Sequence, residues 1–286
     1  MIIRLLIPPC VILLFALILS GCMQPILYES SQLSNFDARP ENIRLEFVTE
    51  KGHQVAFYFP PLNAPQRPPA RLNILYPGIN SLALNWYPFL NREEDPDAAY
   101  LLIDYPGRGL SEGYMRPEDN LRSTEGALKA LSNKFGETEL DAELNLLGHS
   151  FGTGAALQFA ERSKVSRIVL VAPFNTLRAA VAVRSWFLSI IMPDQIDNRK
   201  IIRKILQEKD SPRIAIFHGR LDATLPVAMG RELAAIDPAK IDYFEFANDD
   251  HTSVLTTRRN LIFSLLNGRS EKVAATPQVS GLKNQN

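Results

Sequence analysis

The sequence predicts an α/β fold: a mostly parallel, twisted sheet with helices on both faces. Two observations predict it. Short segments that are apolar on every face are typical of buried parallel strands, and helical stretches separate them, which places the ligand site at the carboxyl ends of the strands. The chain of 286 residues allows one large domain, expected at 43–267. Residues 22–42, polar and without periodicity, are expected to form a tether, and residues 268–286 a disordered tail.

The elements are expected in the following order. Residues 43–49 and 54–59 alternate apolar and polar side chains around Lys51-Gly52, as an antiparallel hairpin does. Residues 60–69 hold five prolines, which cannot join a hydrogen-bonded ladder, so this segment is a loop. Parallel strands are expected at 72–76, 99–105, 144–147, 167–171 and 213–217, and a last strand at 243–246. Helices are expected at about 81–90, 118–134, 153–163, 227–236 and 252–266.

The first 22 residues differ in character from the rest of the chain. Arg4 precedes an apolar run from Leu5 to Leu19, and Ser20-Gly21-Cys22 follows it. The run is short for a membrane span, which needs about 20 apolar residues. We therefore interpret it as a targeting segment.

One motif carries most of the chemical information. Gly148-His149-Ser150-Phe151-Gly152 lies between the expected strand 144–147 and an Ala-rich helix that starts near Thr153. Such a nucleophile elbow lifts a serine oxygen out of the chain, on a turn so tight that the flanking positions require glycine. Ser150 is therefore the candidate nucleophile.

A serine nucleophile needs a base, and the base needs an acid to orient it. The chain has four histidines. His53 lies in the hairpin, His149 is expected to point away from the serine, and His218 is expected to be structural. His251, which follows the last strand and precedes the closing helix, is the expected base.

Asp222 is the expected acid, because it lies in a turn directly after the strand at 213–217. Asp249 and Asp250 are rivals. However, residues adjacent to His251 in the sequence would struggle to reach its far ring nitrogen while the ring faces the serine. Asp222 therefore remains the preferred partner of His251.

An acyl-transfer reaction also needs two preorganised donors for the oxyanion. One is expected to be the backbone amide of Phe151. The other is expected from the loop Tyr76–Ser81, with the amide of Ile79 preferred and that of Asn80 the alternative. The Pro77-Gly78 pair marks a turn whether or not the loop has this role.

Together these motifs resemble the α/β-hydrolase superfamily, in particular its serine aminopeptidase-like and monoacylglycerol lipase-like members. The resemblance runs from about residue 43 to 267 and includes the Gly-rich turn Asp104–Gly113, which receives no catalytic role. The order Ser150, Asp222, His251 is the order of this fold. The usual His-Gly of the oxyanion loop is Pro77-Gly78 here.

The resemblance also implies a small helical lid at about 173–212. This stretch contains the apolar runs Val181–Val183 and Trp186–Met192. Two interpretations remain open: the runs line an acyl pocket, or they belong to an ordinary helix that covers the sheet.

Leu19-Ser20-Gly21-Cys22 resembles the bacterial lipoprotein signal. This resemblance implies that residues 1–21 are a signal peptide and that Cys22 becomes a lipidated N-terminus in the cell envelope, facing the periplasm. Met23 favours the outer membrane. An uncleaved N-terminal anchor is the alternative, and both place the protein on a membrane.

Composition narrows the function classes. With 31 basic and 31 acidic side chains and no basic run, nucleic acid is not an expected partner. No Cys/His/Asp cluster has ligand spacing, so no metal or organic cofactor is expected. The sequence predicts a membrane-anchored serine hydrolase that cleaves an ester, thioester or amide of a small acyl substrate, lipids included. An acyltransferase with the same triad and a non-catalytic binding module are the alternatives.

Overall fold

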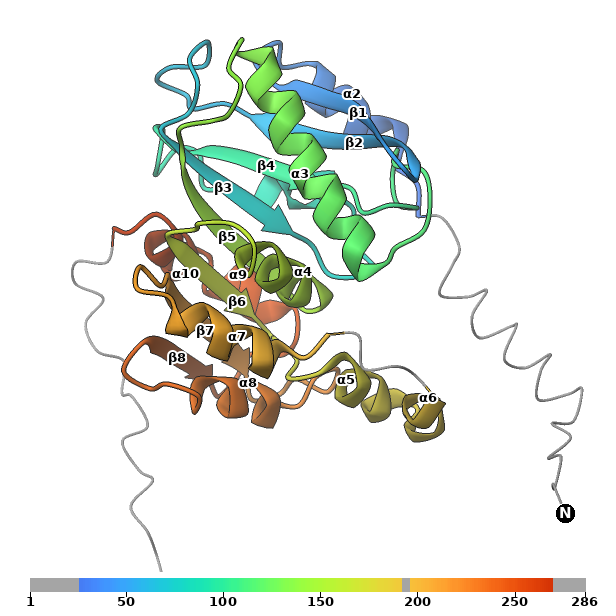
Figure 1. The fold of residues 1–286 in the computed structure, drawn as a ribbon, viewed down its shortest axis with the longest axis vertical. Helices are drawn as coiled ribbons and strands as arrows, with labels where there is room; N and C mark the ends of the chain where they lie inside the picture. Colours follow the sequence, from blue (N-terminus) through green and yellow to red (C-terminus); the bar gives the residue numbers. More distant parts are fainter. Residues whose placement is uncertain (1–25, 192–195, 270–286) are drawn as a thin grey trace, which may run out of the picture.

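A single eight-stranded sheet forms the centre of the structure, a computed structural model that describes residues 26–191 and 196–269 (Figure 1). The strand order is β1-β2-β4-β3-β5-β6-β7-β8. The strands are β1 (Ile43–Thr49), β2 (Gly52–Phe59), β3 (Arg71–Tyr76), β4 (Ala99–Ile103), β5 (Glu143–His149), β6 (Arg167–Val171), β7 (Arg213–Gly219) and β8 (Ile241–Phe246). The strands β3 to β8 are parallel and β2 is antiparallel to both of its neighbours. The predicted hairpin and parallel sheet are confirmed.

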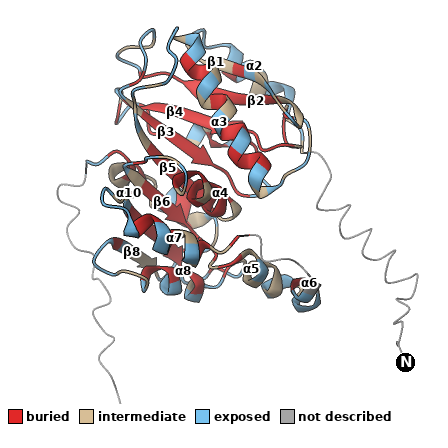
Figure 2. Ribbon diagram, in the orientation of Figure 1, coloured by how far each residue is buried: buried red, intermediate tan, exposed pale blue. Residues whose placement is uncertain are grey.

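Helices cover both faces of this sheet (Figure 2). One face packs against α3 (Pro117–Lys134), α4 (Phe151–Ala160), α7 (Asn198–Gln207) and α8 (Val227–Ala234). The other packs against α2 (Ser30–Asp37), the 3₁₀ helix η1 (Ala83–Phe89), α9 (Ser253–Thr257) and α10 (Arg259–Leu266). The expected closing helix is thus divided in two, at Arg258, whose backbone is not helical.

The expected tether is wrong for its described part, residues 26–42. The α2 helix packs there, and its Phe36 is only 2% exposed. The Phe36 ring lies edge-on against Phe57 and Phe59, with ring centroids 5.0 and 5.4 Å apart. One buried aromatic residue in a short helix gives no apolar periodicity, so the sequence pattern did not reveal this packing.

The expected lid contains two kinds of helix. The α7 helix is an ordinary sheet-covering helix, with Ile202 and Ile205 buried in the core. By contrast, α5 (Leu177–Arg184) and α6 (Trp186–Ile191) project from the body of the molecule (Figure 1), and Trp186 is 71% exposed. The predicted signal peptide, the predicted lipidation site Cys22 and residues 270–286 of the predicted tail 268–286 lie outside the described residues.

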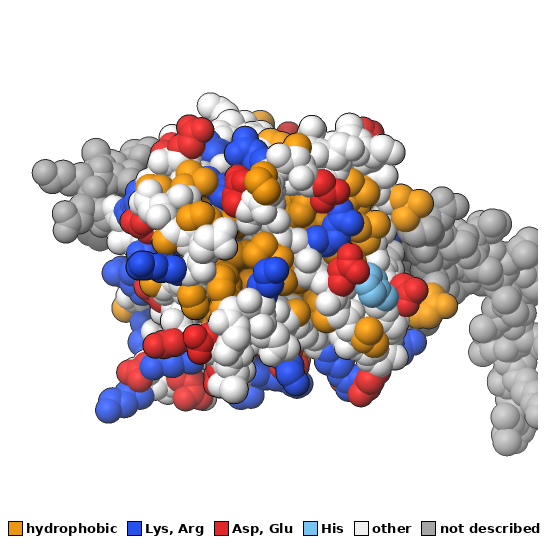
Figure 3. Space-filling view, turned by 90° about the horizontal axis from the view of Figure 1, so that it is seen from above, with side chains coloured by type: hydrophobic (Ala, Val, Ile, Leu, Met, Phe, Trp, Pro, Cys, Tyr) orange, Lys and Arg blue, Asp and Glu red, His pale blue; other side chains and the backbone are white. Residues whose placement is uncertain are grey.

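The described surface carries both signs of charge. Figure 3 looks down on the β1 end of the sheet, where acidic and basic side chains lie side by side with hydrophobic side chains between them. This agrees with the net charge of zero. Across residues 26–191 and 196–269, no helix combines the length and the apolar character needed to cross a membrane.

Candidate active site

The predicted site residues lie in segments that follow four different strands. Ile79 follows β3, Ser150 follows β5, Asp222 follows β7 and His251 follows β8. Because these strands are parallel, their carboxyl ends meet at one edge of the sheet. The fold thereby gathers residues that are up to 172 positions apart in the sequence (251 − 79 = 172).

The turn at Ser150 is tight for a visible steric reason. Ser150 has φ 54° and ψ −120°, an unfavourable backbone conformation for a residue with a Cβ atom. A Cβ added to Gly152 would lie 2.0 Å from the carbonyl oxygen of Tyr76, and one added to Gly148 would lie 2.6 Å from the carbonyl oxygen of Gly152. Both glycines of the motif are therefore required by backbone packing, which presents the Ser150 side chain at the sheet edge.

The structure brings the three predicted residues into one hydrogen-bonded chain. The Ser150 hydroxyl lies 2.9 Å from Nε2 of His251. The Nδ1–H of His251 donates to Oδ2 of Asp222 at 2.7 Å. This tautomer leaves Nε2 free to accept the Ser150 proton, so the arrangement can activate a serine oxygen.

The rival carboxylates have other partners. Asp249 accepts hydrogen bonds from the Thr257 hydroxyl at 3.0 Å and from the Arg258 guanidinium at 2.8 Å. Asp250 accepts from the backbone amides of Thr252 and Ser253, at 2.9 and 2.7 Å, next to the start of α9. Neither takes the position beside the His251 ring that Asp222 occupies.

Asp222 is held as a carboxylate. Burial alone would raise its pKa, but hydrogen bonds from His218, His251 and the Leu225 amide outweigh burial and hold the pKa well below its usual range. His218, which is fully buried, donates its Nε2–H to the Leu225 carbonyl at 2.9 Å, and the same nitrogen lies 3.3 Å from Oδ2 of Asp222. His218, expected to be structural, thus contacts Asp222 directly.

His149, expected to point away from the serine, lies against His251. Its Nε2–H donates to the backbone carbonyl of His251 at 2.8 Å, and the two imidazole centroids lie 4.9 Å apart. Burial and the neighbouring His251 lower the pKa of His149 to about 4, so the ring is neutral at neutral pH. A buried neutral ring therefore holds the backbone of His251.

The predicted oxyanion loop lies beside Ser150. A Cβ added to Gly78 would meet Cβ of Ser150 at 3.6 Å, so the loop from Pro77 to Asn80 approaches the serine closely. Phe151 is the first residue of α4, where an amide has no acceptor within the helix. The roles of the Phe151 amide and of Ile79, with Asn80 as the alternative, stay predictions.

Comparisons with known proteins agree with this geometry. The sequence matches the profile of the family described as the alpha/beta hydrolase fold over residues 74–225, more than half of the chain. The chain belongs to the α/β-hydrolase fold family. No curated protein matches the sequence.

Solved structures support the fold of this α/β hydrolase. An α/β hydrolase from Vibrio vulnificus matches at a TM-score of 0.70 and 14% identity, covering 92% of this chain and 95% of that one. An esterase from Pyrococcus furiosus matches at 0.63 and 15%, covering 86% and 97%. A 2,6-dihydroxy-pseudo-oxynicotine hydrolase matches at 0.61 and 17%, covering 83% and 72%.

The Gly-rich turn of this α/β hydrolase contacts the predicted oxyanion loop and the start of η1. Asp104, 1% exposed, accepts hydrogen bonds from the Ala83 amide at 3.1 Å and from the Tyr28 hydroxyl at 2.5 Å. Its neighbour Tyr105 donates its hydroxyl to the Pro77 carbonyl at 2.8 Å. Burial raises the pKa of Asp104 to about 6, although the hydrogen bonds from Tyr28 and Ala83 favour its charged form.

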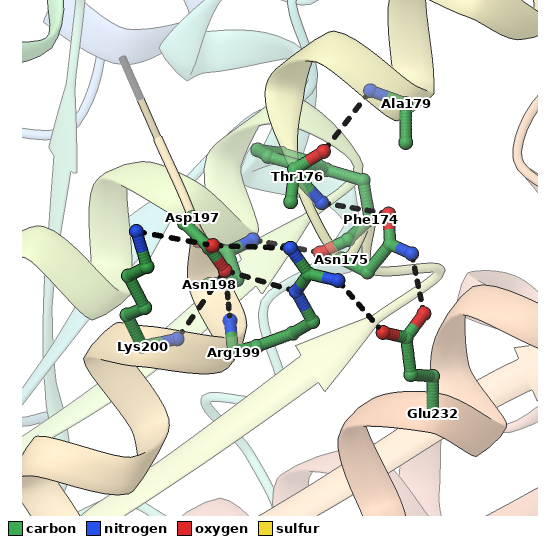
Figure 4. Close-up of polar contacts among 9 residues, drawn as sticks. All are labelled: Phe174, Asn175, Thr176, Ala179, Asp197, Asn198, Arg199, Lys200 and Glu232. Carbon is green, nitrogen blue, oxygen red and sulfur yellow. Dashed lines mark hydrogen bonds and ion pairs between the residues drawn. The ribbon is translucent and has the colours of Figure 1, made fainter. Parts of the chain in front are cut away.

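The two ends of the segment that carries α5 and α6 are held together by polar contacts (Figure 4). Thr176 and Asp197 form a β-bridge at the two ends of the segment. Asp197 accepts from the backbone amides of Arg199 and Lys200, at 3.1 and 3.3 Å, and caps α7. Thr176 caps α5 through the amide of Ala179 at 3.0 Å. The projection is therefore anchored at both ends.

Sequence reasoning missed the supporting contacts of His149, His218 and Tyr28. A position inside the elbow was one available signal for His149, and the spacing of His218 from Asp222 was another. No local pattern singles out Tyr28. In the part of the chain that the structure describes, no three or more His, Cys, Asp or Glu side chains form a group that could hold a metal ion.

Proposed function

We propose that the protein is a serine hydrolase that cleaves an ester, thioester or amide through an acyl-enzyme. The hydrogen-bonded chain from Ser150 through His251 to Asp222 carries this proposal, because its two distances of 2.9 and 2.7 Å suit proton transfer from the serine. Similarity of fold to an esterase supports the same reaction class.

The proposed reaction has two halves. The Ser150 oxygen attacks the acyl carbon while His251 takes its proton, and the negative oxygen that develops is bound by the amide of Phe151 and one from the 79–80 loop. His251 then gives the proton to the leaving group as the bond to it breaks. Water, deprotonated by His251, attacks the acyl-enzyme, and Ser150 regains its proton as the acid product leaves. Throughout, Asp222 holds the imidazole and stabilises its charged form.

Covalent labelling tests the nucleophile. A fluorophosphonate probe should label the wild-type protein, and Ser150→Ala should abolish labelling and lower kcat for a soluble ester by about 10⁶-fold, as loss of a triad serine does. Ser166→Ala removes an exposed serine at the opposite edge of the sheet and should label like the wild type. Equal labelling of Ser150→Ala would contradict the proposal.

Two alternatives share this fold. An acyltransferase would use the same three residues and pass the acyl group to an acceptor other than water, so product analysis with and without an acceptor alcohol separates it from a hydrolase. A non-catalytic binding module would leave the wild-type protein unlabelled by the fluorophosphonate.

The proposal also places the protein in the bacterial cell envelope, facing the periplasm, with Cys22 lipidated after loss of residues 1–21. Cys22→Ala should release the protein from the membrane fraction or block its maturation, because the acyl chains of that cysteine form the anchor. Fractionation and intact-mass measurement check this. Unchanged membrane association with an uncleaved N-terminus would favour the plain anchor instead.

A further inference from the structure

We propose that the carboxyl edge of the sheet, where Ser150 lies, rests on the surface of a lipid bilayer. This inference depends on the lipid anchor at Cys22 proposed above. In this orientation the exposed apolar side chains of that edge contact the acyl and headgroup region of a membrane.

The chain that leads to the anchor is fixed at the carboxyl edge. The amide of Gly109, in the turn after β4, donates to the carbonyl of Ile26 at 2.8 Å. Tyr28 donates to the buried Asp104 at 2.5 Å and accepts from the amide of Leu84 at 3.3 Å. Its ring also lies edge-on to Phe57, with the centroids 5.7 Å apart. Residues 26–28 are therefore part of the domain surface.

The remaining connection to the anchor is short. Cys22 and Ile26 are four residues apart in the sequence, and four extended residues span at most about 14 Å. The seven residues of β5 span about 23 Å from one edge of the sheet to the other. A connection of 14 Å that starts at the carboxyl edge is too short to bring the opposite edge onto the bilayer.

Exposed apolar side chains gather at the same edge. Of the ten large hydrophobic residues that are exposed in the described chain, only Leu62 lies at the opposite edge, after β2. Val48 belongs to the carboxyl edge because β1 runs in the direction of β4. The others follow the parallel strands or precede Tyr28: Leu27, Ile79, Tyr114, Val183, Trp186, Phe187, Ile190 and Leu221.

This distribution fits shallow contact with a membrane. Apolar side chains of peripheral proteins enter the boundary between headgroups and acyl chains by about 5–10 Å. In Figure 1 the described chain begins on the side of the carboxyl ends, and α6 projects to that side. An acyl substrate in that bilayer would meet Ser150 at the membrane surface.

The two tryptophans of the chain provide the test. Trp186 is 71% exposed on α6, whereas Trp86 is 5% exposed in the core. The lipidated full-length product is reconstituted into phosphatidylethanolamine and phosphatidylglycerol vesicles, with or without bromine on the acyl chains, which quenches nearby tryptophan. Brominated vesicles should remove roughly half of the wild-type emission, because one tryptophan of the two lies within the 5–10 Å boundary layer.

Matched variants locate the quenched side chain. Trp186→Phe should lose almost no emission in brominated vesicles, since only Trp86 remains. Adding Leu62→Trp to that variant places a tryptophan at the opposite edge, and its emission should also persist. Equal quenching of the tryptophans at 62 and 186, or no quenching of the wild type, overturns the orientation.

Failure of the lipid anchor can be distinguished from failure of the proposed orientation. Intact mass of the reconstituted protein shows whether Cys22 carries acyl chains. If Cys22 carries no acyl chain, both the lipid anchor and this inference are overturned. Fluorophosphonate labelling of Ser150 tests the proposed hydrolase activity separately. An acylated, vesicle-bound protein whose Trp186 is not quenched overturns this inference alone.

Discussion

At the scale of single residues, the carboxylate of Asp222 is the most constrained group of the site. Its Oδ1 accepts the amides of Thr224 and Leu225, both at 2.8 Å, and its Oδ2 faces His251 at 2.7 Å and His218 at 3.3 Å. Four donors fix both the charge and the direction of this side chain. Asp222 therefore presents a charged oxygen to His251 in one orientation.

Loss of the His218 donor should weaken the site through Asp222. We expect His218→Leu to lower kcat/KM for a soluble ester about tenfold, the effect of losing a hydrogen bond of about 1.4 kcal/mol to a charged group. The acid limb of the pH–rate profile should move to higher pH, because a carboxylate with one donor fewer holds the protonated His251 ring more firmly. Initial rates between acid and neutral pH measure both effects.

His218→Gln is the matched control, because its amide can still donate to Asp222. It should keep most of the activity and the wild-type pH profile. If both variants lose activity equally without a shift of the profile, His218 serves packing alone. Denaturation curves show whether either variant has lost stability.

At the scale of elements, the base of the α5–α6 projection depends on the start of α7. The Asp197 side chain caps this helix and also accepts from the Arg199 guanidinium at 3.1 Å, and Arg199 reaches Glu232 of α8 at 3.0 Å. The amide of Leu177 at the start of α5 donates to the carbonyl of Ile196 at 2.9 Å. These contacts join the projection to the helices that cover the sheet.

Removal of the cap should destabilise this region. Asp197→Ala should lower the free energy of unfolding by about 1–2 kcal/mol, since two amides at the start of α7 lose their acceptor. Asp197→Asn keeps a side-chain oxygen for the cap and loses only a partly exposed ion pair, so its cost should stay below about 1 kcal/mol. Denaturant titration measures both, and equal losses would show that the ion pair matters more than the cap.

At the scale of the whole molecule, two buried groups make the free energy of unfolding change with pH in opposite directions. The pKa of His149 falls to about 4 on folding, so its contribution is present above the pKa of an unfolded histidine and is lost as the pH falls towards 4. The pKa of Asp104 rises to about 6, so its contribution is present at acid pH and is lost as the pH rises through 6. The two slopes offset each other between about pH 4 and 6.

When either group is removed, the dependence of the free energy of unfolding on pH should reflect the remaining group. We expect Asp104→Asn to make the free energy of unfolding rise more steeply with pH between about 4 and 6, by about 1.4 kcal/mol per pH unit relative to the wild type. His149→Asn should change the slope by the same amount in the opposite sense. Denaturant titrations at several pH values measure these slopes, and parallel curves for all three proteins would refute the assignment.

Much of this molecule is predictable from local sequence. Apolar runs revealed the parallel strands, and the glycines around Ser150 revealed the elbow, because both patterns reflect constraints within a few residues. Asp222 and His251 were identifiable for a related reason. Each lies in the segment that follows a strand, and parallel strands bring their carboxyl ends to one edge whatever the details of packing.

The fold class, the elbow and the order of the three predicted site residues follow from the amino-acid sequence without the structure. Three features came from the tertiary structure alone: residues 26–42 pack on the sheet, His149 and His218 contact His251 and Asp222, and the expected lid is part projection and part sheet cover. These features depend on contacts such as that of Tyr28 with Asp104, 76 residues apart. A side chain's partner across such a distance follows from strand order and the shape of the core, which local periodicity does not encode.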